Sequence, residues 1–199
     1  MLTKQMENHA REEAADVLQL LRELCVIPAP SHHEEKRAEF VREWLLANGA
    51  EKVFVDEAKN VICPVGVTED NDVVVFMAHT DTVFPDLEPF TLSEDEEKLR
   101  CPAVGDDTGN LAVFLHAVKY FLQSGRKGKT GILFVANSCE EGLGDLKGSK
   151  QIVKDYGSRI RELISFDGED LGHIVDEAVG SHRYRVKVRT EGESSGYQP

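Results

Sequence analysis

The sequence predicts an α/β fold in which helices cover both faces of a mostly parallel sheet. Short apolar runs alternate with helix-like segments along most of the chain, which is the pattern of strands joined by crossover helices. Two runs, residues 73–78 (VVVFMA) and 131–137 (GILFVAN), are apolar at nearly every position, as expected of strands that are covered on both faces. In such sheets, ligands bind at the carboxyl ends of the strands.

The helices are predicted from apolar spacing and from end signals. Residues 12–25 carry apolar side chains at helical spacing, and the prolines of IPAPS end that helix because proline lacks a backbone donor. Ser31 and Glu34 have the spacing of a capping box, which predicts a second helix over residues 31–46. Further helices are expected at residues 111–122 and 146–156.

The remaining strands are short, and the texture of the chain changes near its end. Besides the two apolar runs, strands are expected at residues 52–55, 60–65 and 163–166. In HRYRVKVRT, apolar and basic residues alternate, which predicts a half-exposed antiparallel strand. We therefore expect residues 1–180 to form one domain and residues 181–199 to begin a second, incomplete one.

Composition and charge exclude several classes of protein. The chain is 41% hydrophobic and 30% charged, as in soluble globular domains, and no apolar run approaches the ~20 residues that cross a bilayer. The N-terminus lacks the apolar core of a secretory signal, so a cytoplasmic location is expected. The net charge of -13 argues against nucleic acid, whose phosphates it would repel. The four cysteines form no C-x-x-C pair and are expected to be reduced thiols.

Histidine and acidic side chains recur where the predicted strands end. They are His79 with Asp81, Glu140 with Glu141, and Asp167, while Asp106 and Asp107 stand just before a predicted helix. Taken singly, each group has an ordinary explanation as a helix cap, a solvated loop or a turn. Because the predicted fold brings all of them to one edge of the sheet, together they indicate a metal site. Imidazole and carboxylate ligands suit zinc, cobalt or manganese.

The motifs HTDTV, GDDTGN, EEG and DG, in this order, resemble those of the co-catalytic di-zinc exopeptidases. That family includes peptidase T, glutamate carboxypeptidase, aminoacylase and succinyl-diaminopimelate desuccinylase. The resemblance implies a three-layer zinc-peptidase-like catalytic domain, with residues 1–180 as its first half and residues 181–199 as the start of a lid and dimerisation domain.

The resemblance also implies an activity, namely the hydrolysis of amide bonds in small peptides or N-acyl amino acids. The cofactors would be two divalent metals, of which zinc is expected and cobalt or manganese are alternatives. The family's lids often pair, so a homodimer is compatible with this interpretation. Neither nucleic acid nor a membrane is expected as a partner.

Each motif residue takes a role from the resemblance. Four would bind metal, with His79 and Asp167 on the first ion, Glu141 on the second, and Asp106 on both. Asp81 would orient His79 by accepting the second N–H of the imidazole, which fixes its tautomer. Glu140 would be the general base that deprotonates the water between the metals.

Three features depart from the family pattern. Thr108 stands where the family usually carries lysine, and aligning TEGESS on the family's Gly-His-Ser puts Ser194 where a histidine that holds the substrate carbonyl is expected. The family also takes a histidine for the second metal from the second half of its catalytic domain. The histidines after Asp167 are His173 and His182, which match the link and the first lid strand instead. We therefore predict that this chain alone is an inactive or feeble peptidase.

Two other interpretations remain open. A non-catalytic, truncated fragment that acts as a metal- or partner-binding module agrees with these departures, but such a module does not need the general base Glu140. A cysteine hydrolase would use Cys139 as nucleophile and His79 as base. Nothing near Cys139 in the sequence supplies the cationic setting that lowers a thiol pKa, so a buried structural cysteine is the better interpretation.

Overall fold

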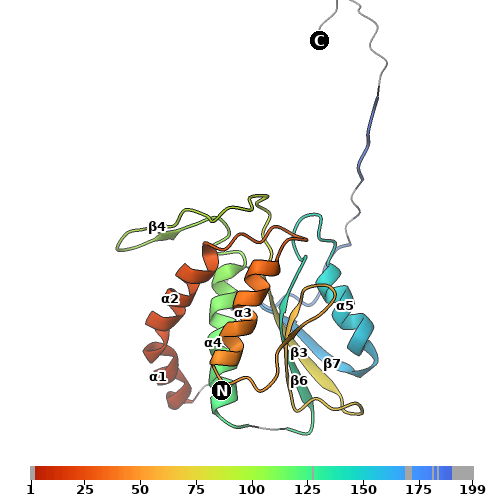
Figure 1. Ribbon diagram of the computed structural model, residues 1–199. Coiled ribbons are helices and arrows are strands. Elements are labelled where there is room, and N and C mark those ends of the chain that lie inside the picture. The colour runs from red at the N-terminus through yellow and green to blue at the C-terminus, as the bar shows by residue number, and fades with distance from the viewer. Residues whose placement is uncertain (1–2, 127, 169–171, 181, 183, 190–199) are drawn as a thin grey trace, which may run out of the picture. The chain divides into compact units, whose positions relative to one another are not determined.

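The computed structural model describes residues 3–126, 128–168, 172–180, 182 and 184–189. The chain divides into two units, Met1–Glu169 and Asp170–Pro199, and all the described helices and strands lie in the first (Figure 1). The helices are α1 (Lys4–Glu12), α2 (Ala14–Cys25), α3 (Glu35–Ala47), α4 (Thr108–Gln123) and α5 (Lys147–Tyr156), with a 3-10 turn at Gly157–Arg159. The strands are β1 (Phe54–Val55), β2 (Val61–Val65), β3 (Val73–His79), β4 (Ser93–Glu94), β5 (Leu99–Arg100), β6 (Gly131–Asn137) and β7 (Ile160–Ser165).

Five strands form a mixed sheet in the order β1-β2-β6-β3-β7. β3 is parallel to both β6 and β7, whereas β2 is antiparallel to β6 and β1 to β2. The register of β3 with β6 continues from Val73 opposite Gly131 to His79 opposite Asn137. The parallel centre agrees with the prediction from the two apolar runs. It places the carboxyl ends of β3, β6 and β7 at one edge of the sheet.

Helices cover both faces of the sheet, as predicted (Figure 1). On one face, α2, α3 and α4 pack on β2, β3 and β6, and Leu24, Val41 and Leu115 are fully buried there. On the other face, Ile152 of α5 packs in a cluster with Val75 of β3. Burying each such side chain contributes roughly 1.5–3 kcal/mol. The side chains of β3 alternate between these two covered faces, which explains its almost continuous apolar sequence.

The predicted capping box at Ser31 and Glu34 is wrong. Helix α3 begins at Glu35, and its N-cap residue Glu34 makes no side-chain hydrogen bond to the helix. The Ser31 hydroxyl instead donates to Asp81 Oδ2 at 2.7 Å and to the backbone carbonyl of Glu141 at 3.1 Å. Ser31, whose spacing to Glu34 resembles a capping box, therefore connects the loop before α3 to the carboxyl edge of the sheet.

Helix α1 and the β4–β5 pair of strands were not predicted. Helix α1 buries none of its residues, and the Thr3 side chain caps it by accepting the N–H of Met6 at 3.3 Å. Strands β4 and β5 have two residues each and pair only with one another within the described chain. Neither element has the apolar periodicity from which the others could be predicted.

The second unit is described for residues 172–180, 182 and 184–189, which form no helix or strand and are exposed. Val186 and Val188 are 83% and 81% exposed, so the half-exposed strand expected here is not formed in the described part. Ser194 lies outside the described residues. The domain boundary at residue 180 and the lid therefore stay predictions.

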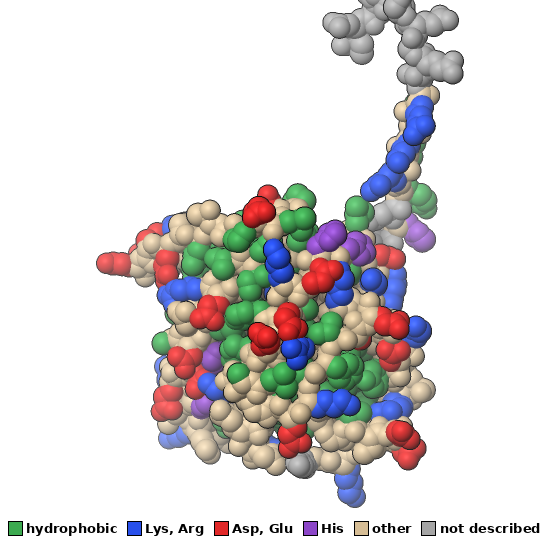
Figure 2. All heavy atoms as spheres, viewed as in Figure 1, with side chains coloured by type: hydrophobic (Ala, Val, Ile, Leu, Met, Phe, Trp, Pro, Cys, Tyr) green, Lys and Arg blue, Asp and Glu red, His purple; other side chains and the backbone are tan. Residues whose placement is uncertain are grey.

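Figure 2 shows acidic and basic side chains interspersed with apolar ones over the visible face of the first unit. None of the helices in the described part of the chain is both long and apolar enough to span a bilayer.

Candidate metal centre

The sheet delivers the predicted site residues to its carboxyl edge. His79 is the last residue of β3, and its partner Asn137 is the last residue of β6, so Glu140 and Glu141 follow at the same edge. Asp167 comes two residues after the end of β7, which is parallel to β3. Because these strands are adjacent and parallel, residues that are far apart in the sequence meet there.

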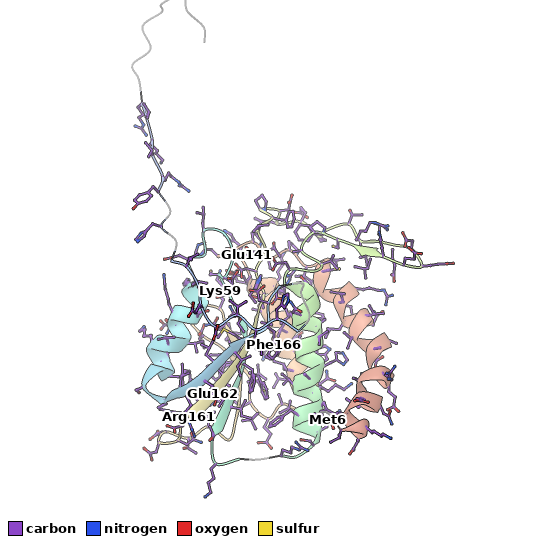
Figure 3. All side chains as sticks on the ribbon, turned by 180° about the vertical axis from the view of Figure 1, so that it is seen from behind. Met6, Lys59, Glu141, Arg161, Glu162 and Phe166 are labelled. Carbon is purple, nitrogen blue, oxygen red and sulfur yellow. The ribbon has the colours of Figure 1, made fainter. Side chains whose placement is uncertain are left out.

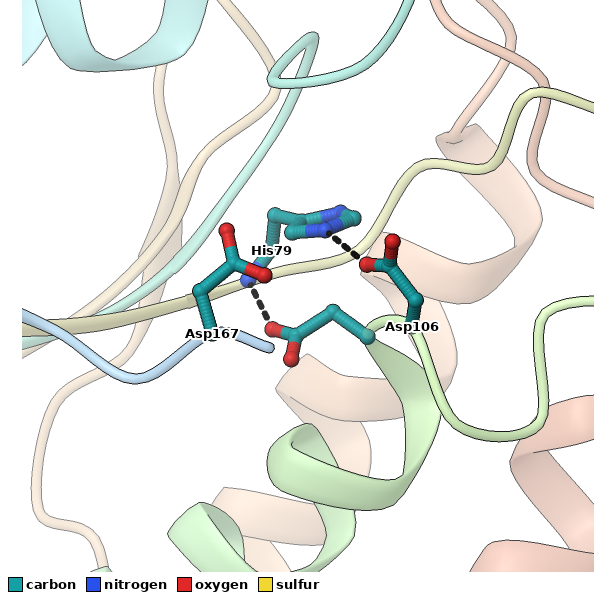
Figure 4. Close-up of side chains that lie close together, drawn as sticks. His79, Asp106 and Asp167 are labelled. Carbon is teal, nitrogen blue, oxygen red and sulfur yellow. Dashed lines mark hydrogen bonds and ion pairs between the residues drawn. The ribbon is translucent and has the colours of Figure 1, made fainter. Parts of the chain in front are cut away.

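The core of the candidate site is a cluster of one imidazole and three carboxylates (Figure 4). His79, Asp106, Asp107 and Asp167 each offer a ligand atom, and these atoms lie within 4.8 Å of one another. His79 Nε2 is 3.1 Å from Asp106 Oδ1. His79 is buried, whereas the Asp106 side chain is 56% exposed, so the cluster can be reached from solvent. This donor set suits zinc, cobalt or manganese.

The two glutamates lie beside this cluster. Glu140 Oε2 is 3.9 Å from His79 Nε2, which places a carboxylate of the predicted general base next to the imidazole. Glu141 does not belong to the group of four whose ligand atoms lie within 4.8 Å. Its position is nevertheless tied to the site, because its N–H donates to Asp81 Oδ2 at 3.0 Å.

Asp81 is connected both to His79 and to the glutamate segment. The Nδ1–H of His79 donates to the backbone carbonyl of Asp81 at 3.0 Å, and the carboxylate Oδ1 is 3.4 Å from the same nitrogen. This contact leaves Nε2 facing Asp106. The carboxylate also accepts the N–H groups of Glu140 and Glu141 at 2.9 and 3.0 Å. The second of these functions is not visible in the sequence.

Asp107 is a site residue that the sequence reasoning passed over in favour of its neighbour. It is buried, its Oδ2 accepts the backbone N–H of His79 at 2.8 Å, and its Oδ1 accepts the side-chain amide of Asn110 at 2.7 Å. The peptide bond between Asp106 and Asp107 is cis. The GDDTGN motif contains both aspartates, but it did not tell that Asp106 would contact the His79 imidazole while Asp107 accepts the His79 backbone N–H.

The electrostatics of the site indicate an excess of negative charge. Burial alone would lower the pKa of His79, but the hydrogen-bonded carboxylate of Asp81 and the charges of Asp107 and Glu140 raise it to about 10. Burial raises the pKa of Asp107 to about 7 and also raises the pKa values of Glu140 and Glu141. Carboxylates gathered in a poorly solvated place stabilise positive charge nearby. The site is therefore suited to hold a cation.

The alternative nucleophile, Cys139, lies in an unsuitable environment. It is fully buried, and burial raises the pKa of its thiol to about 11. The thiol donates to Glu34 Oε1 at 3.1 Å, which further disfavours the thiolate. The structure thus supports the interpretation of Cys139 as a structural cysteine.

An α/β domain that collects a histidine and several carboxylates at the carboxyl edge of its sheet can hold a divalent metal ion there. The sequence model of the family described as Peptidase family M20/M25/M40 matches residues 75–196 of the chain. The chain therefore belongs to this family.

The relatives are much longer than this chain. A protein of Escherichia coli named uncharacterized protein YgeY is 25% identical over 188 residues, which cover 92% of this chain and 45% of that protein. The aminopeptidase PepT from Bacillus cereus superposes with a TM-score of 0.60 at 18% identity, over 77% of this chain and 43% of its own. Human carnosine dipeptidase 1 superposes with a TM-score of 0.63 at 17% identity, over 81% of this chain and 40% of its own. These likenesses support the fold, and the chain spans less than half the length of each of these relatives.

Proposed function

We propose that this chain supplies the metal-binding half of a hydrolase that cleaves amide bonds in small peptides or N-acyl amino acids. The observation that carries the proposal is the cluster of His79 with Asp106, Asp107 and Asp167, with Glu140 beside it, at the carboxyl edge of the sheet. The printed names of the relatives PepT, an aminopeptidase, and human carnosine dipeptidase 1 support small peptides as substrates.

In this proposal the site holds two divalent metals, with zinc preferred and cobalt or manganese as alternatives, because imidazole and carboxylate ligands suit these ions. His79, Asp106 and Asp167 would hold the first, and Asp106 and Glu141 would hold the second. When bound, such ions polarise the amide carbonyl and lower the pKa of water. Asp81 keeps the Nε2 of His79 directed at the cluster because its backbone carbonyl and carboxylate face Nδ1.

Glu140 carries the proton transfer in this proposal. Its pKa is raised by burial, which makes its carboxylate a better proton acceptor than an exposed glutamate. It would take a proton from the attacking water and deliver it to the leaving amine. The position of Glu140 beside the cluster, with Oε2 3.9 Å from His79 Nε2, supports this assignment.

The test is metal binding by the dialysed chain beside an Asp106→Ala variant. We expect the parent to retain zinc or cobalt and the variant to lose affinity by more than about 100-fold, because a ligand matters at least as much as its supporting groups. Asp86→Ala, which removes an exposed aspartate outside the cluster, is the matched control and should bind as the parent does. Absence of metal from the parent would contradict the proposal.

A second candidate is a non-catalytic metal- or partner-binding module. It is favoured by the position of Glu141, which does not belong to the group of four residues whose ligand atoms lie within 4.8 Å of one another. Metal binding without turnover of dipeptides or acyl amino acids would support the module, whereas robust, chelator-sensitive turnover would exclude it. The cytoplasmic location and the homodimer also remain proposals that rest on the sequence.

A further inference from the structure

The segment that carries Glu140 and Glu141 is held in an unusual way. Four successive backbone N–H groups, those of residues 138–141, each donate to a side chain rather than to a neighbouring strand. In chain order the acceptors are Asn60 Oδ1, Glu34 Oε1, Asp81 Oδ1 and Asp81 Oδ2, at 3.0, 3.1, 2.9 and 3.0 Å. Within this segment, Cys139 has a backbone φ of 55°. This is a left-handed conformation that a non-glycine residue keeps only where its surroundings impose it.

Glu34 is the charged one of the two acceptors in this series, Glu34 and Asn60, that make no hydrogen bond to the metal cluster among the described residues. It is fully buried, and it precedes α3 without capping it. Its Oε1 accepts the N–H of Cys139 at 3.1 Å, the thiol of Cys139 at 3.1 Å and the N–H of His32 at 2.9 Å. A buried carboxylate is costly unless it is paired and hydrogen-bonded, so its presence here calls for an explanation.

Lys59 supplies the opposite charge. Its Nζ is 3.5 Å from Glu34 Oε2, which has no hydrogen-bond partner among the described residues, and 2.6 Å from Oε1 of the exposed Glu35. Nζ also donates to the backbone carbonyl of His32. Figure 3 shows Lys59 and Glu141 toward the same end of the molecule. The charge of Glu34 is thus balanced from the side away from Cys139.

We propose that Glu34 is a positioning residue, which fixes the segment of Glu140 and Glu141 in the orientation that metal binding and proton transfer need. It acts through Cys139, whose N–H and thiol both donate to one carboxylate oxygen. The inference rests on the proposed function, because Glu140 and Glu141 need such a support only if they serve the metal site. In this account the length of the Glu34 side chain, which brings Oε1 to Cys139, positions the segment. The negative charge of Glu34 serves the ion pair with Lys59.

Two substitutions separate reach from charge. Glu34→Asp keeps the charge but withdraws the carboxylate from Cys139 by about one methylene, so the segment should loosen. Glu34→Gln keeps an oxygen at the same reach, so the segment should stay in place. Glu35→Gln is the matched control, because Glu35 pairs with the same Lys59 but is exposed and does not touch residues 138–141. Glu34→Ala, which removes the carboxylate, serves as the second variant if Glu34→Asp does not fold.

The first measurement is amide hydrogen exchange by NMR, made without metal. In Glu34→Asp we expect the N–H groups of Glu140 and Glu141 to exchange about tenfold faster relative to the buried amides of β3, while both glutamine variants stay within about threefold of the parent. Unchanged exchange in Glu34→Asp would overturn the proposal. So would faster exchange that extends in proportion to Val75 and Met77 of β3, because Glu34 would then be an ordinary core residue.

The second measurement titrates each protein with Co²⁺ alone. We expect Glu34→Asp to bind Co²⁺ about tenfold more weakly than the parent and Glu35→Gln to bind it equally well, in keeping with the effect of groups that support ligands. A parent that binds no Co²⁺ would count against the proposed function, even if the exchange result held. Equal Co²⁺ affinity of parent and Glu34→Asp, with a loosened segment, would overturn the positioning role while leaving the metal site intact.

Discussion

Asp81 shows how one residue can connect the parts of the candidate site. Its backbone carbonyl accepts from His79 Nδ1, and its two carboxylate oxygens accept the N–H groups of Glu140 and Glu141, with Ser31 donating to Oδ2 as well. All the groups that face the carboxylate are donors. A carboxylate satisfies them together because it is an acceptor only.

Replacing Asp81 by asparagine should therefore be costly. Whichever way the amide is turned, its NH₂ group faces the N–H of Glu140 or of Glu141, which loses its acceptor. We expect Asp81→Asn to weaken Co²⁺ binding by about 10–100-fold and the free energy of unfolding to fall by about 1–3 kcal/mol. Cobalt absorption titration and urea unfolding would measure the two effects, with exposed Asp86→Asn as control. Parent-like Co²⁺ affinity in Asp81→Asn would refute this account.

At the residue scale, the sequence sufficed to predict which side chains come together but not how they are oriented, and their metal-binding roles stay predictions. His79, Asp106 and Asp167 were predicted to meet, and the structure brings them within 4.8 Å of one another together with Asp107. The function of Asp107 could not be predicted, because adjacent aspartates before a helix look alike until the turn is known. Ser31 was misread for a similar reason, since its spacing to Glu34 fits a cap that the folded chain does not use.

At the element scale, the buried strands were the most predictable. The run 131–137 is β6 as expected, and β3 extends one residue beyond the expected 73–78 to include His79. Elements buried on two faces have sequences that only a covered strand explains. The strand expected at 163–166 is Ile160–Ser165. Most of its residues are exposed, so its sequence is less apolar and its bounds were harder to predict. The exposed helix α1 and the β4–β5 pair have no apolar pattern from which they could have been predicted.

The start of α5 gives a prediction about how elements fit together. A Cβ on Gly148 would lie 2.3 Å from the backbone oxygen of Ser138 and 2.4 Å from Asn60 Oδ1. Ser138 begins the segment that carries Glu140, and its N–H donates to Asn60 Oδ1. Gly148→Ala should push α5 away from that segment and destabilise the protein by about 1–3 kcal/mol or more. Thermal unfolding would measure it.

The control for Gly148→Ala lies at the other end of the same helix. At Gly157 the φ of -49 suits any residue, and an added Cβ would meet only the flexible Val153 side chain at 3.4 Å. Gly157→Ala should therefore change the free energy of unfolding by no more than about 0.5 kcal/mol. Equal melting temperatures for the two alanine variants would mean that the close approach at Gly148 relaxes without cost.

At the scale of the whole molecule, an apolar groove lies open on the first unit. The groove, of about 420 Å³, lies along α4, and its lining includes Val113, Phe114, Phe134 and Phe166. Figure 3 shows Phe166, which follows β7, toward α4. Among the described residues β7 pairs with β3 alone, and an unpaired strand edge offers backbone groups that can pair with another chain.

This open region predicts self-association of the chain. Val113 is 58% exposed and Ile164 of β7 is 37% exposed, and apolar grooves beside an unpaired strand edge promote association. We expect light scattering to give an apparent mass that rises with concentration, and Val113→Glu combined with Ile164→Lys to return it toward that of a monomer. Val153→Glu, on α5 outside the groove and 54% exposed, should leave association unchanged. A parent that stays monomeric at every concentration would show that the groove and the β7 edge are tolerated in isolation.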